Sequence, residues 1–244
     1  TAVILHALDG LQAPLGAIKE SCLDYIDSLW TNEGGFHGNW ADDTLDVVRS
    51  FADPRVEIVP GLPRGRIPDT FAAALRSCRG DTIFLSDQDD LWLAGKVDAC
   101  LRALDASGAL LVVHDAVVVD GLGNVLAPSF SRARGFRPGF WRNLWRPGYL
   151  GCATALRREL LEVALPFPPD LPMHDWWLGL LAERTGKVAY LDQPFLHHVR
   201  HGANANFSPR SSPYGPLRRL AFRWTILQAV RRRLAQRPHG NLAG

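Results

Sequence analysis

Three aspartates stand close together at the end of an apolar run. In "TIFLSDQDDLW" (82–92), Asp87, Asp89 and Asp90 directly follow residues typical of a buried strand. Neighbouring carboxylates repel one another and lose hydration where they are buried, so we expect a positive partner beside them. Hard divalent cations such as Mg²⁺ or Mn²⁺ take carboxylate oxygens and keep positions open for substrate phosphates. The spacing therefore predicts a cation and diphosphate site at Asp87 and Asp89.

Other interpretations of this acidic turn stay open. Acids are favoured at the start of a helix, and Asp90 could cap the helical pattern that follows it. A solvated acidic turn is a second alternative, because DxD tripeptides are common. A calcium loop does not fit, since Leu91 and Trp92 occupy the fifth and sixth positions, where D-x-D-x-D-G needs Asp and Gly.

The elements that must position these acids alternate between strand and helix patterns. Val97, Cys100, Leu101 and Leu104 give one helix an apolar face, for example. Such alternation predicts an α/β fold with a mostly parallel sheet and helices on both faces, in which ligands bind beyond the carboxyl ends of strands. We expect strands at 2–5, 55–59, 81–87, 109–119 and 187–192, and helices at 44–52, 68–78, 97–104, 154–164 and 175–184.

Composition narrows the function classes. A net charge of +2 over 244 residues argues against a chain-wide nucleic-acid interface, and 47% apolar residues can build a sizeable core. We find neither a secretion signal nor an apolar run long enough to span a membrane. The four cysteines form no CxxC pair, which argues against a zinc cluster or disulfide framework and predicts a reducing, cytoplasmic location.

The C-terminal region is basic. No Asp or Glu follows Asp192, and arginines alternate with apolar residues from Arg210 onward, which indicates a basic amphipathic helix. The helix is either a solvated element packed on the domain or a peripheral anchor on anionic lipid. As an anchor it would hold the protein at the inner face of the cytoplasmic membrane.

Several motifs together resemble one family. "FLSDQDDLW" followed by a Lys-containing helix resembles the rhamnosyltransferase-like branch of family-2 glycosyltransferases, which have the GT-A fold. Further similar segments are "VVHDAVVVDGLGN", "YLGCATALRREL", "MHDWWLGLLAERTG" and "HHVRHGANAN". The resemblance covers about residues 42–206 and implies a GT-A-like domain at 1–206, with 1–41 atypical, followed by a basic tail at 207–244.

The resemblance implies a metal-dependent inverting hexosyltransferase that uses a nucleotide-sugar donor, and its rhamnosyltransferase-like branch favours rhamnose as the sugar. Its acceptor would be a glycan or lipid-linked molecule of the cell surface. Asp175 would be the general base, although a capping role at its helix start is an alternative, as is core packing for the neighbouring tryptophans. The implied sites are donor and diphosphate (Asp87, Asp89, Asp42, Asp43), acceptor (Gly151, Cys152, Trp176, Trp177) and metal (Asp87, Asp89, His201).

The N-terminal region departs from the family pattern. In "HGNWADDT" (37–44), His37 and Gly38 stand where the family has aspartates that contact the nucleobase. An alternative function is therefore a catalytically impaired GT-A scaffold that binds carbohydrate or assists assembly. A phosphohydrolase with Asp87 as nucleophile is less consistent, because such enzymes need a hydroxyl residue just after DxD and Asp90-Leu91 offers none.

Overall fold

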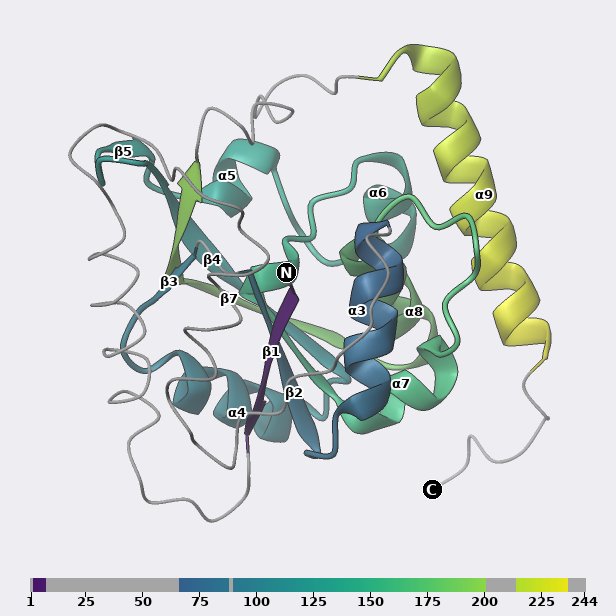
Figure 1. Ribbon diagram of the computed structural model, residues 1–244, viewed down its shortest axis with the longest axis horizontal. Coiled ribbons are helices and arrows are strands. Elements are labelled where there is room, and N and C mark those ends of the chain that lie inside the picture. Colours follow the sequence, from purple (N-terminus) through teal and green to yellow (C-terminus); the bar gives the residue numbers. More distant parts are fainter. Residues whose placement is uncertain (1, 8–65, 88–89, 201–213, 237–244) are drawn as a thin grey trace, which may run out of the picture. The chain divides into compact units, whose positions relative to one another are not determined.

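The computed structural model describes residues 2–7, 66–87, 90–200 and 214–236 (Figure 1). The chain divides into two compact units, Thr1–Ala7 with Leu62–Gly244, and Leu8–Gly61. The second unit lies outside the described residues, and with it the elements expected at 44–52 and 55–59 and the donor residues Asp42 and Asp43. Asp89 and His201 also lie outside them.

A mixed sheet forms the centre of the first unit. Its strand order is β1-β2-β6-β4-β7-β3, with β5 beside β4. The strands are β1 (Ala2–Ala7), β2 (Thr82–Asp87), β3 (Leu91–Trp92), β4 (Leu111–Asp120), β5 (Val125–Ala127), β6 (Thr154–Arg157) and β7 (Val188–Arg200). The expected mostly parallel sheet is wrong for these strands, since among them only β4 and β7 pair in parallel. β6 is one cause, because it runs between β2 and β4 and is antiparallel to both.

Helices cover both faces of this sheet, as expected for an α/β fold. Successive strand residues point to opposite faces, so in β2 Ile83 and Leu85 pack toward α3, α7 and α8, whereas Phe84 packs toward α4. The helices are α3 (Ile67–Ser77), α4 (Lys96–Ser107), α5 (Phe130–Arg134), α6 (Phe140–Trp145), α7 (Arg158–Ala164), α8 (His174–Thr185) and α9 (Pro216–Ala235), with a 3₁₀ turn η1 (Gly151–Ala153).

Three buried clusters make up the core of the described residues. The largest joins α3, α7, α8 and α9 to one face of the sheet, the second joins α4 to the other face, and the third lies around the carboxyl half of β4. Each cluster contains one buried cysteine: Cys78, Cys100 and Cys152, respectively.

α9 packs on the domain along one face. Ile226 and Val230 are almost fully buried in the largest cluster, and Arg233 Nη1 donates to the carbonyl oxygens of Val163 at 2.6 Å and Leu165 at 2.9 Å. This face of α9 therefore closes part of the core, as the interpretation of the helix as an element packed on the domain requires. No helix in the described ranges is long and apolar enough to cross a membrane.

Candidate active site

Asp175 is held in the first turn of α8, which follows the N-cap residue Met173. Its carboxylate accepts the amide of Trp176 at 2.6 Å, and the backbone amide of Gly151 in η1 also hydrogen-bonds to it. Gly151 packs so closely here that a Cβ would lie 2.8 Å from Nε2 of His174 and 3.6 Å from Cβ of Asp175. This gives Gly151, expected on the acceptor side, a structural role in positioning the carboxylate.

The environment of Asp175 suits a general base. Burial raises the pKa of its carboxyl to about 7, and the nearby charge of Asp87 acts in the same direction, while the hydrogen bonds from Trp176 and Gly151 lower it. Taken as a whole, the residue is half-buried. A base works best when its pKa lies near the operating pH. At this helix start, desolvation raises the pKa of Asp175 by more than the hydrogen bonds from backbone amides lower it.

A methyl group at position 151 is expected to disturb this geometry. Gly151→Ala should force apart His174 and Asp175 and lower turnover by at least about tenfold, since a 1 Å misplacement can cost about 10²-fold. The matched control is Gly215→Ala, because a Cβ there meets nothing within 4 Å. Steady-state kinetics of both variants test this, and an unchanged kcat in Gly151→Ala would contradict the positioning role.

Lys96 supplies a positive charge beside the acidic turn. The residue is only 2% exposed, its Nζ donates to the carbonyl oxygen of Cys152 at 2.7 Å, and Nζ lies 3.7 Å from the centroid of the Trp92 ring. Burial lowers the pKa of Lys96 to about 8, while charges that include those of Asp90 and Asp87 raise it. Sequence reasoning noted a lysine in this helix but gave it no role; its place just after the acidic turn was the available signal.

Asp90 is fixed by the end of β7. Its Oδ1 accepts hydrogen bonds from Nδ1 of His198 at 2.8 Å and from the amide of Val199 at 3.2 Å. The capping role considered for Asp90 is wrong, because α4 begins at Lys96 with Gly95 as its N-cap. Asp90 therefore ties the acidic turn to the late strand, a link between residues far apart in the sequence.

One group of described residues has the composition of a metal site. A carboxylate oxygen of Asp90, Sγ of Cys152 and a ring nitrogen of His198 all lie within 4.8 Å of one another. Burial raises the pKa of the Cys152 thiol well above its usual value, whereas a metal requires the thiolate. The set therefore fits a thiolate-bound metal poorly.

Carboxylates at the end of β2 fit a hard divalent cation better. Asp87 lies close enough to Asp175 to raise its pKa, and Oδ2 of Asp90 is buried with no hydrogen-bond partner in the part of the chain that the structure describes. Repulsion among carboxylates and an unsatisfied carboxylate oxygen are both relieved by an oxygen-seeking cation. The assignment of Asp87 and Asp89 as its ligands, and of His201 as a third, stays a prediction.

The tryptophans expected on the acceptor side lie in the core instead. Trp177 is fully buried and its indole N–H donates to the Ala164 carbonyl at 3.2 Å, while Trp176 is 6% exposed and donates to the Asn143 carbonyl at 2.9 Å. Rings enclosed in this way cannot stack on a sugar, so that assignment is wrong. Cys152 is also buried, with its carbonyl bound to Lys96.

An arginine cluster around Arg134, whose charge interacts with that of Asp175, was not anticipated. Burial lowers the pKa of Arg134 to about 10, the charges of Arg200 and Arg146 lower it further, and the charge of Asp175 opposes them. These arginines come from α5, from the residue that follows α6, and from the end of β7. Guanidinium groups suit phosphate oxygens. The Arg-rich stretch at 128–149 was the signal in the sequence.

The fold and these residues define a class of GT-A-like transferase. The structure superimposes on S. aureus TarS 1–349 in complex with UDP-GlcNAc with a TM-score of 0.52 and 14% identity, covering 82% of this chain and 56% of that one. A weaker match, with a TM-score of 0.39 and 19% identity, covers 97% of this chain and 80% of glucosyl-3-phosphoglycerate synthase from Mycobacterium tuberculosis, whose complex contains Mn²⁺ and UDP. At 14% identity, the likeness to TarS concerns the fold alone.

The chain belongs to glycosyl transferase family 2, whose model matches residues 38–165, more than half of the chain. An uncharacterized glycosyltransferase of Nostoc sp. (strain PCC 7120) is 23% identical over 150 residues. That alignment takes in 58% of this chain and 46% of the Nostoc protein. The chain thus spans less than half the length of this curated relative.

Proposed function

We propose that the protein is a metal-dependent, inverting glycosyltransferase that uses a nucleotide-sugar donor. The observation that carries this proposal is the environment of the Asp175 carboxyl. Burial raises its pKa to about 7, and Asp87 at the end of β2 is close enough for its charge to raise that pKa as well. A base and a diphosphate-binding acid at one site are what a single displacement at an anomeric carbon requires.

In the proposed reaction, Asp175 takes the proton of the acceptor hydroxyl as that oxygen attacks the anomeric carbon. The new C–O bond forms while the bond to the diphosphate breaks, so the nucleoside diphosphate leaves with the electron pair and the anomeric configuration inverts. Asp87 and Asp89 would hold the divalent cation, which when bound offsets the charge of the leaving group. Arg134 lies close enough to Asp175 for the two charges to interact, and its guanidinium would also favour phosphate.

The donor and acceptor are proposed from the motifs. The "SDQDD" segment followed by Trp92 supports dTDP-rhamnose as donor, through its resemblance to the rhamnosyltransferase-like branch. The acceptor would be a cell-surface polysaccharide or glycolipid that is built on the cytoplasmic side of the membrane.

A screen of nucleotide sugars tests the proposal. With Mn²⁺ present, dTDP-rhamnose at 100 times its dissociation constant should stabilise the chain by roughly 2.7 kcal/mol, and free nucleoside diphosphate should appear once acceptor is added. EDTA should abolish both effects. Binding without turnover would instead support the impaired scaffold suggested by His37 and Gly38, and no binding of any nucleotide sugar would overturn both ideas.

A further inference from the structure

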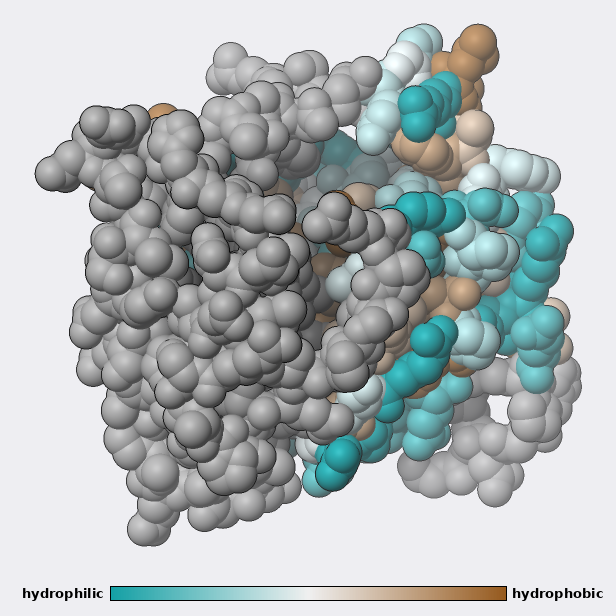
Figure 2. Space-filling view, viewed as in Figure 1, coloured by the Kyte–Doolittle hydropathy of each residue, from teal (hydrophilic) through white to brown (hydrophobic). Residues whose placement is uncertain are grey.

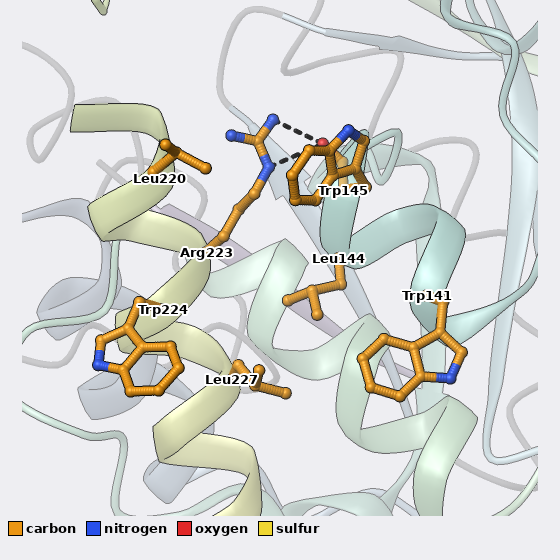
Figure 3. A pocket seen from close by; sticks show the side chains of 7 residues that line it. All are labelled: Trp141, Leu144, Trp145, Leu220, Arg223, Trp224 and Leu227. Atoms are coloured by element: carbon orange, nitrogen blue, oxygen red, sulfur yellow. Dashed lines mark hydrogen bonds between the residues drawn. The ribbon is translucent and has the colours of Figure 1, made fainter. Parts of the chain in front are cut away.

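An apolar groove lies between α6 and α9 (Figure 3). Its volume is about 450 Å³, and three tryptophans at its rim are unusually exposed, Trp141 at 70%, Trp145 at 64% and Trp224 at 62%. Leu144 and Leu227 lie between the two helices, as Figure 3 shows. Large aromatic rings with a polar N–H are seldom left in water without a use, and a cluster of them marks an interaction surface.

The outer row of α9 continues this surface. Leu217, Leu220, Trp224, Leu227 and Arg231 follow one another at alternating spacings of three and four residues, so they share one side of the helix. Leu227 is half-buried and packs against the core cluster that holds Ile226 and Val230, whereas Leu217, Leu220 and Trp224 are exposed. Figure 2 shows strongly hydrophobic and strongly hydrophilic residues side by side along α9. The helix therefore packs with one side and presents an apolar row beside arginines on another.

The charge on this surface has one sign. α9 contains no Asp or Glu, and no residue that lines the groove is acidic. Arg223 holds α6 and α9 together by donating to the Trp145 carbonyl from Nε at 3.0 Å and from Nη2 at 2.6 Å (Figure 3). The exposed arginines of the helix are Arg218, Arg219, Arg231 and Arg232. The occupant should therefore be anionic as well as apolar.

We propose that the α6–α9 face, defined by Trp141, Trp145, Leu217, Leu220 and Trp224 with the exposed arginines of α9, docks on an anionic phospholipid bilayer. Tryptophan rings settle at the headgroup level with the ring in the apolar layer and the N–H toward water, and arginines bind the phosphates. α9 then lies in the plane of the interface. The proposal goes beyond sugar transfer and does not depend on it.

Vesicle binding by the full chain tests this surface. The chain should co-sediment with vesicles of phosphatidylcholine and phosphatidylglycerol at 7:3, and it should not bind vesicles made only of phosphatidylcholine. Binding should weaken when the salt concentration rises from about 0.1 M to 0.5 M. Trp141→Ser with Trp224→Ser should lower the partition coefficient by at least about tenfold. Arg231→Gln with Arg232→Gln should lower it on the order of tenfold. Neither pair includes Arg223 or Arg233, which make packing contacts.

Two matched controls keep the result interpretable. Leu122→Ser with Leu126→Ser removes exposed apolar side chains elsewhere, and Arg76→Gln with Arg102→Gln removes exposed charge elsewhere. Both should bind as the wild type does. Equal binding to the two vesicle types, or binding unchanged by the tryptophan pair, would overturn the proposal. A dimer in solution that the same pair dissociates would also overturn it and assign the face to a second copy. Since no donor is used, these outcomes are separate from failure of the transferase proposal.

Discussion

Asp175→Asn is expected to slow turnover by at least about 10²-fold, the lower end for loss of a positioned general base. The amide cannot take the acceptor proton but keeps nearly the same shape, so donor and cation affinity should persist. In the wild type, kcat/KM should rise by about tenfold per pH unit below pH 7 and level off above it, because the base must be ionised and burial raises its pKa to about 7. The variant should not show this rise of kcat/KM below pH 7.

The pH dependence of the free energy of unfolding tests the raised pKa of Asp175 independently of turnover. A carboxyl whose folded pKa lies above its unfolded value contributes stability at low pH, and that contribution is lost as the pH rises from about 4 to about 7. Asp175→Asn should therefore become more stable relative to the wild type over this range in urea denaturation. Asp170→Asn, on an exposed carboxylate five residues earlier, is the control. A variant that loses donor affinity yet keeps its turnover would make Asp175 a binding residue.

Asp89→Asn and Asp87→Asn are each expected to abolish metal-dependent transfer. Each exchange removes a charged oxygen ligand from the end of β2, and the cation would then no longer offset the charge of the departing diphosphate. The fold should survive, because Asp87 is the partly exposed last residue of its strand and the exchange relieves repulsion between carboxylates. Assays of transfer over a Mn²⁺ titration measure the loss.

The control for these acids is Asp81→Asn, which changes an exposed carboxylate just before the same strand. It should transfer sugar at the wild-type rate. The role of the cation would be contradicted if Asp89→Asn transferred sugar as fast as the wild type. It would also be contradicted if EDTA did not slow transfer by the wild type.

Local periodicity predicted several elements closely. The helix expected at 68–78 is α3 at Ile67–Ser77, and that expected at 175–184 is α8 at His174–Thr185. The apolar run before the aspartates is β2. In each case the pattern that defines the element is contained within it, so no distant contact was needed to recognise it.

Distant pairing explains the errors. The stretch 154–164 reads as one helix, yet its first four residues form β6, because pairing with β2 and β4 on both sides buries Ala155 and Leu156. β7 was expected to end at 192, near Pro194, but runs on to Arg200 with irregular register beside β4. That extra length brings His198 to Asp90, a contact that no local pattern encodes.

Sequence motifs proposed the chemistry of the candidate site, but they could not predict its geometry. Motifs singled out Asp87 and Asp175 by residue type and position. They could not reveal that Lys96 is buried beside the acids or that Trp177 belongs to the core, because burial depends on which elements pack together.

Among the described residues, the buried cysteines Cys78, Cys100 and Cys152 can serve as three chemical reporters. Thiol reagents attack the thiolate, so a buried thiol reacts only when its surroundings open. Cys78, Cys100 and Cys152 lie in three different clusters, so their rates of alkylation would report separately on the α3 side, the α4 side and the neighbourhood of the acidic turn. If nucleotide and cation bind at the end of β2, labelling of Cys152 should slow most. The rate of local opening at the site could thus be measured by mass spectrometry of alkylated Cys152, without adding any probe to the chain.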